Sequence, residues 1–257
     1  MIQIKNAKEL EGMRRANALS AAALKYGGEH IEAGMTTWEL DKLIYEFIVK
    51  HGGTPNFKGL YGFPGTACIS LNDTVIHGIP SHDTVIRPGD IVSIDTGAKV
   101  DGFNGDNACT YPVGKVDLEA QRLLDVTKEA LHLGIAQAKA GNRIGDIGHA
   151  VQAYCEAAGF SVVRDFVGHG TGRELHEDPE VPNFGNPGRG PRLVPGMTIA
   201  IEPMICQYGW KVKTLADGWT VKTKDGGLAA HFEHSVAILK DRTEIMTIGW
   251  EQPGFTL

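Results

Sequence analysis

A long internal repeat constrains the fold of this chain more strongly than any other feature of its 257 residues. The segment 33–52 begins with Ala-Gly and ends with glycine, and a similar segment recurs 107 residues later at 140–159. The same separation relates a Pro-Gly turn and β-branched strand at 87–95 to another at 194–202. Because two copies at so long a period indicate a duplication rather than a solenoid, we expect two halves related by a pseudo-twofold axis.

Helix caps and residue patterns predict the same order of helices and strands in each half. A first helix is predicted over 7–26 with Asn6 as its N-cap, and a second from the capping box at 36–39 to the glycines at 52–53. Further helices are expected to begin near 117 and 144, and strands are expected near 68–71, 91–94, 108–112, 198–202, 219–222 and 229–239.

This order predicts an α+β fold in which helices cover the outer face of a mostly antiparallel, curved sheet. The whole chain, 1–257, is interpreted as a single catalytic domain. Its internal halves are placed at about 7–114 and 115–245.

Charge and cysteine usage argue against several classes of protein. The net charge is −6 without a long run of one sign, so we expect no direct readout of nucleic acid. The basic residues near the start are interpreted as the solvent face of a helix; they are Lys5, Lys8, Arg14 and Arg15. Four scattered cysteines suit a reducing, cytoplasmic location, and no apolar run is long enough for a membrane span.

Asp95 and Glu202 end the two repeated strands and are separated by the repeat distance. A pseudo-twofold axis would bring them face to face near the centre of the molecule. Such carboxylates are costly in a sheet core unless they are paired or bind metal. The alternative is that each is an exposed charge at a strand end, which the apolar neighbours Ile94 and Ile201 disfavour.

Three further residues complete a possible ligand set: Asp106, His169 and Glu233. Asp106 is expected to end a turn that returns towards Asp95, and a surface turn residue is its alternative. Glu233 is predicted to lie on a strand, and His169 stands among glycines that permit close approach, although a lone histidine can be merely structural. Four carboxylates and one imidazole suit two divalent ions such as Mn²⁺, Fe²⁺ or Co²⁺.

Two more histidines, His77 and His176, stand in polar loops. Each alone would be interpreted as a surface residue. None of the seven remaining histidines is assigned a role, although His231 shares a face with Glu233.

Five blocks of this sequence, in this order, resemble the type I methionine aminopeptidases of the pita-bread fold, in their short bacterial form. The blocks are 72–80, 95–106, 168–177, 198–203 and 232–235, and the resemblance extends over essentially the whole chain. It implies a two-metal hydrolase with the metal ligands Asp95, Asp106, His169, Glu202 and Glu233. It also implies that His77 and His176 contact the substrate.

The resemblance further implies a methionine pocket lined by Phe57, Leu60, Phe63, Cys68, Leu175 and Trp219. The family often has tyrosine where this chain has Leu60 and phenylalanine where it has Leu175. The lining remains apolar, so a preference for methionine is still expected.

The implied reaction removes the initiator methionine from nascent proteins whose second residue is small. Glu202 is expected to move the water proton as a general base and then acid, His176 to donate to the developing oxyanion, and His77 to contact the amide nitrogen. The implied partners are nascent polypeptide N-termini, with transient ribosome association, and the chain is expected to be a monomer.

Two alternatives are weighed against this function. Xaa-Pro aminopeptidases and prolidases share the fold, but they usually carry a large N-terminal domain, whereas the first helix here is expected to begin almost at Met1. A metal-free binding protein of the same fold is disfavoured because all five expected ligands are present.

Overall fold

The computed structural model describes residues 1–255 and 257. It has two pairs of long helices and two short 3-10 helices: α1 (Ala7–Glu29), α2 (Thr37–Lys50), α3 (Leu118–Gln137), α4 (Ile144–Ala157), η1 (Leu60–Gly62) and η2 (Ile248–Glu251). The predicted N-caps of α1 and α2 are confirmed, and α3 begins where it was expected. Asn6 and Thr36 form capping boxes with Glu9 and Glu39, and Asp117 accepts from the Ala120 N–H.

Short and long strands form four small sheets of four, three, three and five strands. The strands are β1 (Thr54–Pro55), β2 (Ala67–Leu71), β3 (Thr74–Ile76), β4 (Ile91–Val100), β5 (Phe103–Pro112), β6 (Ser161–Val162), β7 (Gly168–Gly170), β8 (Glu177–Val181), β9 (Thr198–Ile201), β10 (Met204–Cys206), β11 (Val212–Thr214), β12 (Val221–Thr223), β13 (Ala229–His231), β14 (His234–Ile238) and β15 (Thr243–Ile245). All pairings between these described strands are antiparallel, as predicted.

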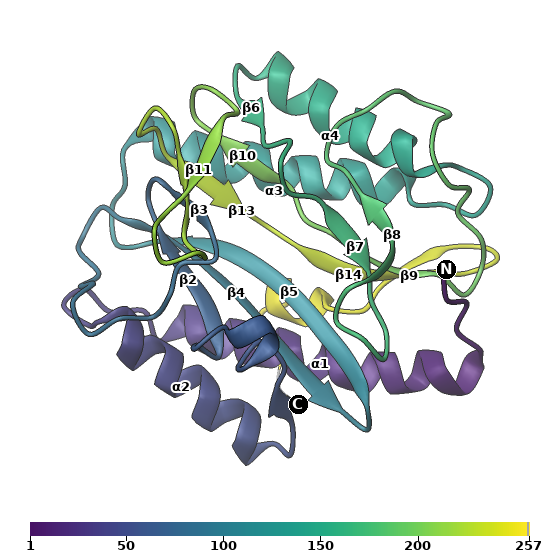
Figure 1. Ribbon diagram of the computed structural model, residues 1–257, viewed down its shortest axis with the longest axis horizontal. Coiled ribbons are helices and arrows are strands. Elements are labelled where there is room, and N and C mark those ends of the chain that lie inside the picture. Colours follow the sequence, from purple (N-terminus) through teal and green to yellow (C-terminus); the bar gives the residue numbers. More distant parts are fainter. Residues whose placement is uncertain (256) are drawn as a thin grey trace.

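The helices lie outside the strands, so the expected α+β arrangement is confirmed (Figure 1). Helix α1 packs along the β4–β5 hairpin, and α3 packs against β10 and β13. Ile94 and Ile201 are fully buried in the apolar cluster between helices and strands. In the described part of the chain, no helix is both long enough and apolar enough to cross a membrane.

The repeat extends to the bounds of the elements themselves. Helices α2 and α4, and the first residues of β4 and β9, are each separated by 107 positions. The isolated bridge between Thr36 and Val85 has its counterpart, at the same separation, between Arg143 and Arg192. We propose on this basis that the chain is one domain, 1–257, made of the halves 7–114 and 115–245.

Two predicted strands differ from those observed. The hairpin turn occupies only Asp101 and Gly102, so Asp106 lies within β5 rather than at the end of a turn. The strand predicted over 229–239 is broken at Phe232 and Glu233, between β13 and β14. Backbone pairing decides both differences, because β5 continues wherever β4 lies beside it, and β13 and β14 pair with two different strands, β10 and β9.

Candidate metal centre and substrate pocket

The β4–β5 hairpin places Asp95 and Asp106 on one face. Asp95 lies opposite Ala108, and Asp106 is two residues from Ala108 along the neighbouring strand. Because alternate residues of a strand share a face, the two carboxylates form a diagonal cross-strand pair. Ile94 points into the apolar core beneath the helices, which turns Asp95 towards the opposite side of the sheet.

The second half contributes Glu202 and Glu233 at adjacent positions. Strand β9 ends at Ile201, which pairs with His234 at the start of β14. The next residues outward along this register are Glu202 and Glu233. The Glu233 N–H donates to the Ala108 carbonyl at 2.9 Å, and this bond joins the second half to the hairpin that carries the two aspartates.

His169 on β7 faces carboxylates from both halves. Its Nε2 lies 3.5 Å from Asp106 Oδ2 and 3.6 Å from Glu202 Oε1. Its Nδ1 lies 2.8 Å from the Gly170 carbonyl oxygen, which can only accept a hydrogen bond. The ring proton therefore belongs on Nδ1, and the lone pair of Nε2 points at carboxylates, an arrangement typical of a metal-binding histidine.

The donor atoms of this centre fit a metal and lack other partners. Asp95 Oδ1, Asp106 Oδ1 and Glu233 Oε1 are buried and accept no hydrogen bond from the described residues. Ligand atoms of Asp106, His169 and Glu233 all lie within 4.8 Å of one another. Among the described residues that line the cavity, none is lysine or arginine. An excess of buried negative charge without a protein cation favours divalent metal.

Burial explains the protonation behaviour of these groups without metal. It raises the pKa of Asp95 to about 7 and that of Glu202 to about 8. Burial together with the neighbouring carboxylates raises the pKa values of Asp106 and Glu233 far above their ordinary range. Burial lowers the pKa of His169 to about 3, so its imidazole is neutral at physiological pH and can act as a ligand.

The predicted ligands, both predicted loop histidines and the predicted methionine pocket line one cavity of about 480 Å³. Phe57, Phe63, Cys68 and Leu175 form a buried apolar cluster on its wall. Leu60 and Trp219 pack against this cluster. The cavity thus combines a polar, acidic end with an apolar end, which is the usual composition of a small-molecule or side-chain pocket.

His77 and His176 reach this cavity from different segments. His77 follows β3 with a positive φ of 57°, and its ring stands edge-on to Phe166 and Trp219. The His176 ring lies 4.4 Å from that of His169. Burial lowers the pKa of His77 to about 4 and also lowers that of His176, so both imidazoles are neutral near pH 7, each with one donor and one acceptor nitrogen.

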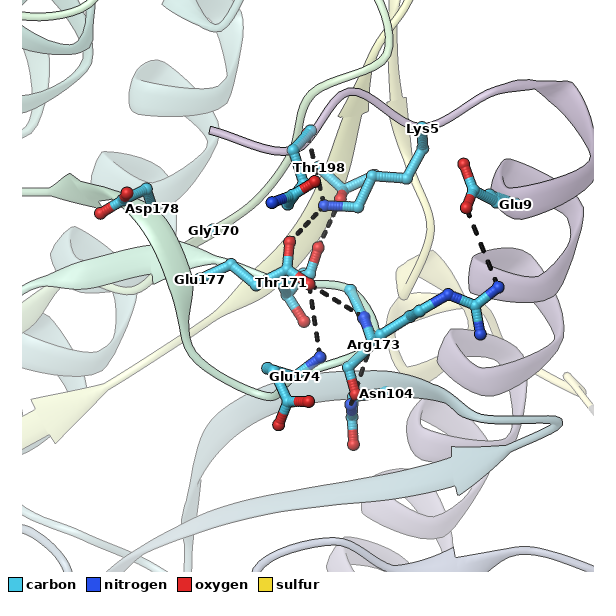
Figure 2. A network of polar contacts seen from close by, with 12 residues as sticks. Lys5, Glu9, Asn104, Gly170, Thr171, Arg173, Glu174, Glu177, Asp178 and Thr198 are labelled. Carbon is cyan, nitrogen blue, oxygen red and sulfur yellow. Dashed lines mark hydrogen bonds and ion pairs between the residues drawn. The ribbon is translucent and has the colours of Figure 1, made fainter. Parts of the chain in front are cut away.

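A buried ion pair supports the loop that carries His176 (Figure 2). Glu177 Oε2 lies 2.5 Å from Lys5 Nζ, and Glu177 Oε1 accepts from the N–H groups of Arg173 and Glu174 at 3.0 and 3.3 Å. Both charged side chains are less than 10% exposed. The prediction that Lys5 belongs to a solvent-facing cluster was therefore wrong, because Lys5 precedes α1 and turns inward to Glu177.

His231 is a site residue to which the sequence interpretation assigned no role. Its Nε2 lies 3.5 Å from Glu202 Oε2, and the residue is 2% exposed. The sequence did contain a signal for this residue: His231 stands two residues before Glu233, and in an extended segment this spacing places both side chains on one face. Tyr61 and Phe166 also line the cavity without having been predicted.

Comparisons with known proteins agree with this geometry. Residues 11–240 match metallopeptidase family M24. The methionine aminopeptidase of Clostridium perfringens is 53% identical over 96% of this chain and 99% of that protein, and methionine aminopeptidase 1 of Bacillus subtilis is 49% identical over 96% and 99%. This chain belongs to the methionine aminopeptidases of family M24. Membership of a metallopeptidase family implies that the chain binds divalent metal.

Solved structures of methionine aminopeptidases share the fold. The enzyme of Thermotoga maritima superposes with a TM-score of 0.94 at 45% identity, with 96% of this chain and 99% of that chain covered. The Xaa-Pro dipeptidase of Bacillus anthracis superposes with a TM-score of 0.78 at 23% identity, so it shows the fold alone. This chain covers 62% of that longer chain, whereas it matches the methionine aminopeptidase almost from end to end.

Proposed function

We propose that this chain removes the initiator methionine from nascent proteins whose second residue is small. The observation that carries the proposal is the cavity itself, in which an acidic centre and an apolar pocket for one side chain lie side by side. Its partners are nascent polypeptide N-termini, met in the cytoplasm during transient association with ribosomes, and it acts as a monomer.

The proposed metal ligands are Asp95, Asp106, His169, Glu202 and Glu233. Their four carboxylates and one imidazole suit two divalent ions, drawn from Mn²⁺, Fe²⁺ and Co²⁺. The unpartnered oxygens of Asp95, Asp106 and Glu233 supply lone pairs for such ions. When bound, the ions would lower the pKa of a bound water and polarise the scissile carbonyl.

The chain's own groups hold the substrate and move the protons. Glu202 lies within 3.6 Å of His169 and accepts the water proton, then transfers it to the leaving amine. His176 donates a hydrogen bond to the carbonyl oxygen as its negative charge develops. His77 accepts a hydrogen bond from the amide N–H beyond the scissile bond, and His231 helps to orient Glu202 from the opposite side, at 3.5 Å.

The apolar wall selects the first side chain. Phe57, Phe63 and Cys68 are buried, and Trp219 packs edge-on to Phe63 with ring centroids 5.1 Å apart. An unbranched thioether fits such a surface, whereas a charged side chain would lose its hydration without gaining a partner. Leu60 and Leu175 keep the wall apolar while offering less aromatic contact than the tyrosine and phenylalanine common in the family.

Peptide hydrolysis tests this proposal and separates it from a prolidase-like activity. The purified chain, supplied in turn with Mn²⁺, Fe²⁺ and Co²⁺, is expected to cleave Met-Ala-Ser, to cleave Met-Leu-Ser far more slowly and to leave Ala-Pro intact. Removal of metal with a chelator should stop cleavage, and its return should restore it. Preferred hydrolysis of Ala-Pro, or equal cleavage of the two methionyl peptides, would contradict the proposal.

A further inference from the structure

A second cluster of metal-type ligands lies outside the cavity, where η2 meets α3 and β14. In the part of the chain that the structure describes, only two groups of three such side chains converge within 4.8 Å, and one of them is His132, His234 and Glu251. His132 comes from α3, His234 from β14 and Glu251 from the end of η2. Segments far apart in sequence thus deliver two imidazoles and one carboxylate to one point.

The spacing of these donors matches a tetrahedral ion. His132 Nε2 lies 3.0 Å from Glu251 Oε1, and His234 Nε2 lies 3.5 Å from Glu251 Oε2. Ligands held at about 2.0–2.1 Å in tetrahedral geometry stand roughly 3.3 Å apart, between these two values. The ring centroids of His132 and His234 lie 5.9 Å apart, and the His132 side chain, which is one-third exposed, has room to move closer when an ion binds.

If these three side chains formed only ion pairs, the Nε2 atom of His234 would have no hydrogen-bond partner. Its Nε2 is completely buried and makes no hydrogen bond, because 3.5 Å exceeds the 2.7–2.9 Å of a charge-assisted bond. Its Nδ1 lies 2.8 Å from Thr247 Oγ1, a buried hydroxyl that also accepts from the Ser235 N–H. In the tautomer whose Nδ1 donates to this hydroxyl, the Nε2 lone pair points towards Glu251, as in zinc-binding histidines that donate their other ring N–H to an outer partner.

We propose that His132, His234 and Glu251 form a third metal site, which binds Zn²⁺ or a similar borderline divalent ion. Two imidazoles and a carboxylate are the ligands that such ions prefer, and they leave a fourth position for water. The site is structural. It ties the C-terminal η2 to α3 and to β14, whose first residue is His234.

Substitution of Lys128 tests the proposal, because a metal site predicts that metal binding becomes stronger and not weaker. Its Nζ lies 3.0 Å from Glu251 Oε1, so the ammonium competes with a metal for the same carboxylate. The side chain is 45% exposed and can move into solvent when an ion binds. Replacement of Lys128 by an uncharged residue of similar length should therefore strengthen metal binding, although it removes a salt bridge.

Zinc content measures the site directly. Metal-stripped protein is equilibrated with buffered Zn²⁺, separated from free ion and analysed for zinc per chain. We expect His132→Ala to bind one ion fewer than the unsubstituted chain, and His149→Ala, which removes an exposed histidine of α4, to bind the full number. Equal zinc content in His132→Ala and the unsubstituted chain would overturn the proposal.

The affinity of Lys128→Met supplies the second measurement. Methionine keeps the packing of the stem on Trp250, over which the ammonium lies 5.4 Å from the ring centroid. We expect the dissociation constant of the His132-dependent zinc ion to fall roughly fivefold, because a like charge beside the ion is gone. An unchanged or larger constant would overturn the proposal. Neither measurement depends on peptidase activity, so the outcome stands apart from the proposed function.

Discussion

The central cavity and the C-terminal cluster contain similar donors but differ in charge. In both, an imidazole nitrogen lies about 3.5 Å from a carboxylate oxygen, at His169 and Asp106 and again at His234 and Glu251. The cavity gathers the four carboxylates proposed as ligands, with Glu177 and Glu180 also in its lining and no lysine or arginine among its described lining residues. The cluster has a single carboxylate, and Lys128 already contacts it.

This difference appears in the ionisation of the carboxyl groups. Burial raises the pKa values of Asp95 and Glu202 to about 7 and about 8. Burial also acts against ionisation of Glu251, but the contacts with His132 and Lys128 and the nearby His234 imidazole outweigh it and hold the pKa of this carboxyl far below its usual range. The cavity carboxylates can therefore ionise together only beside an added cation, whereas Glu251 is ionised without one, so we expect the C-terminal cluster to bind metal more weakly.

The largest expected effect comes from removing charge at the centre. Asp95→Asn should lower kcat/KM by roughly 10³-fold or more, because a neutral amide is a poor ligand for two cations. The matched change in the other cluster, Glu251→Gln, should leave kcat/KM within about threefold. Peptide hydrolysis combined with metal analysis measures both, and comparable losses in the two variants would contradict the distinction between the clusters.

The substitution His176→Ala should have the next largest effect on activity. Loss of a hydrogen bond to the developing oxyanion should lower kcat/KM by about 10²–10³-fold, while the metal content of the protein stays the same. If metal is lost from His176→Ala, the residue is a ligand and its proposed role as a donor is wrong.

Lys5→Met tests another buried carboxylate, Glu177, whose ion pair with Lys5 holds the loop of His176. Breaking this pair should lower kcat roughly threefold to tenfold and leave KM nearly unchanged, because the donor is displaced while the pocket is intact. Lys5→Arg should recover most of the activity. A change confined to KM, or none in either parameter, would show that the pair does not position His176.

The smallest effect is the pH dependence of the metal-free protein. A carboxyl whose folded pKa is raised stabilises the fold at low pH and loses that contribution as pH rises towards the folded value. Between pH 7.5 and 8.5, which lies above the ordinary pKa of histidine, the lowered pKa values of residues such as His77 and His169 contribute little, and Asp95 and Glu202 should reduce the Tm by roughly 2–3 °C.

Two controls accompany this thermal measurement. Glu202→Gln should flatten the slope, and saturation with metal should abolish it, since bound ions favour the ionised carboxylates. Glu251 acts in the opposite direction, because its lowered pKa gives stability above the unfolded value that is lost in acid. A metal-free Tm that is constant or rises from pH 7.5 to 8.5 would contradict the charge imbalance inferred for the cavity.

The sequence by itself determined what depends on neighbouring residues and on the repeat. Caps at Asn6, Thr36 and Asp117 specified where helices begin, because a capping hydrogen bond joins residues two or three positions apart. The repeat of 107 residues also paired Asp95 with Glu202, because duplicated halves place equivalent strand ends at equivalent positions.

Only the tertiary structure decided which distant groups meet. Local sequence contained no signal that Lys5 would reach Glu177, or that Glu251 would lie between His132 and His234. These contacts arise when the first residues, helix α3 and the last turn are packed against the same strands. The partners Lys5 and Glu177, and His132 and Glu251, are more than a hundred residues apart in sequence, so only the packing of the whole chain brings them together. A cap or a turn, by contrast, depends only on its immediate neighbours.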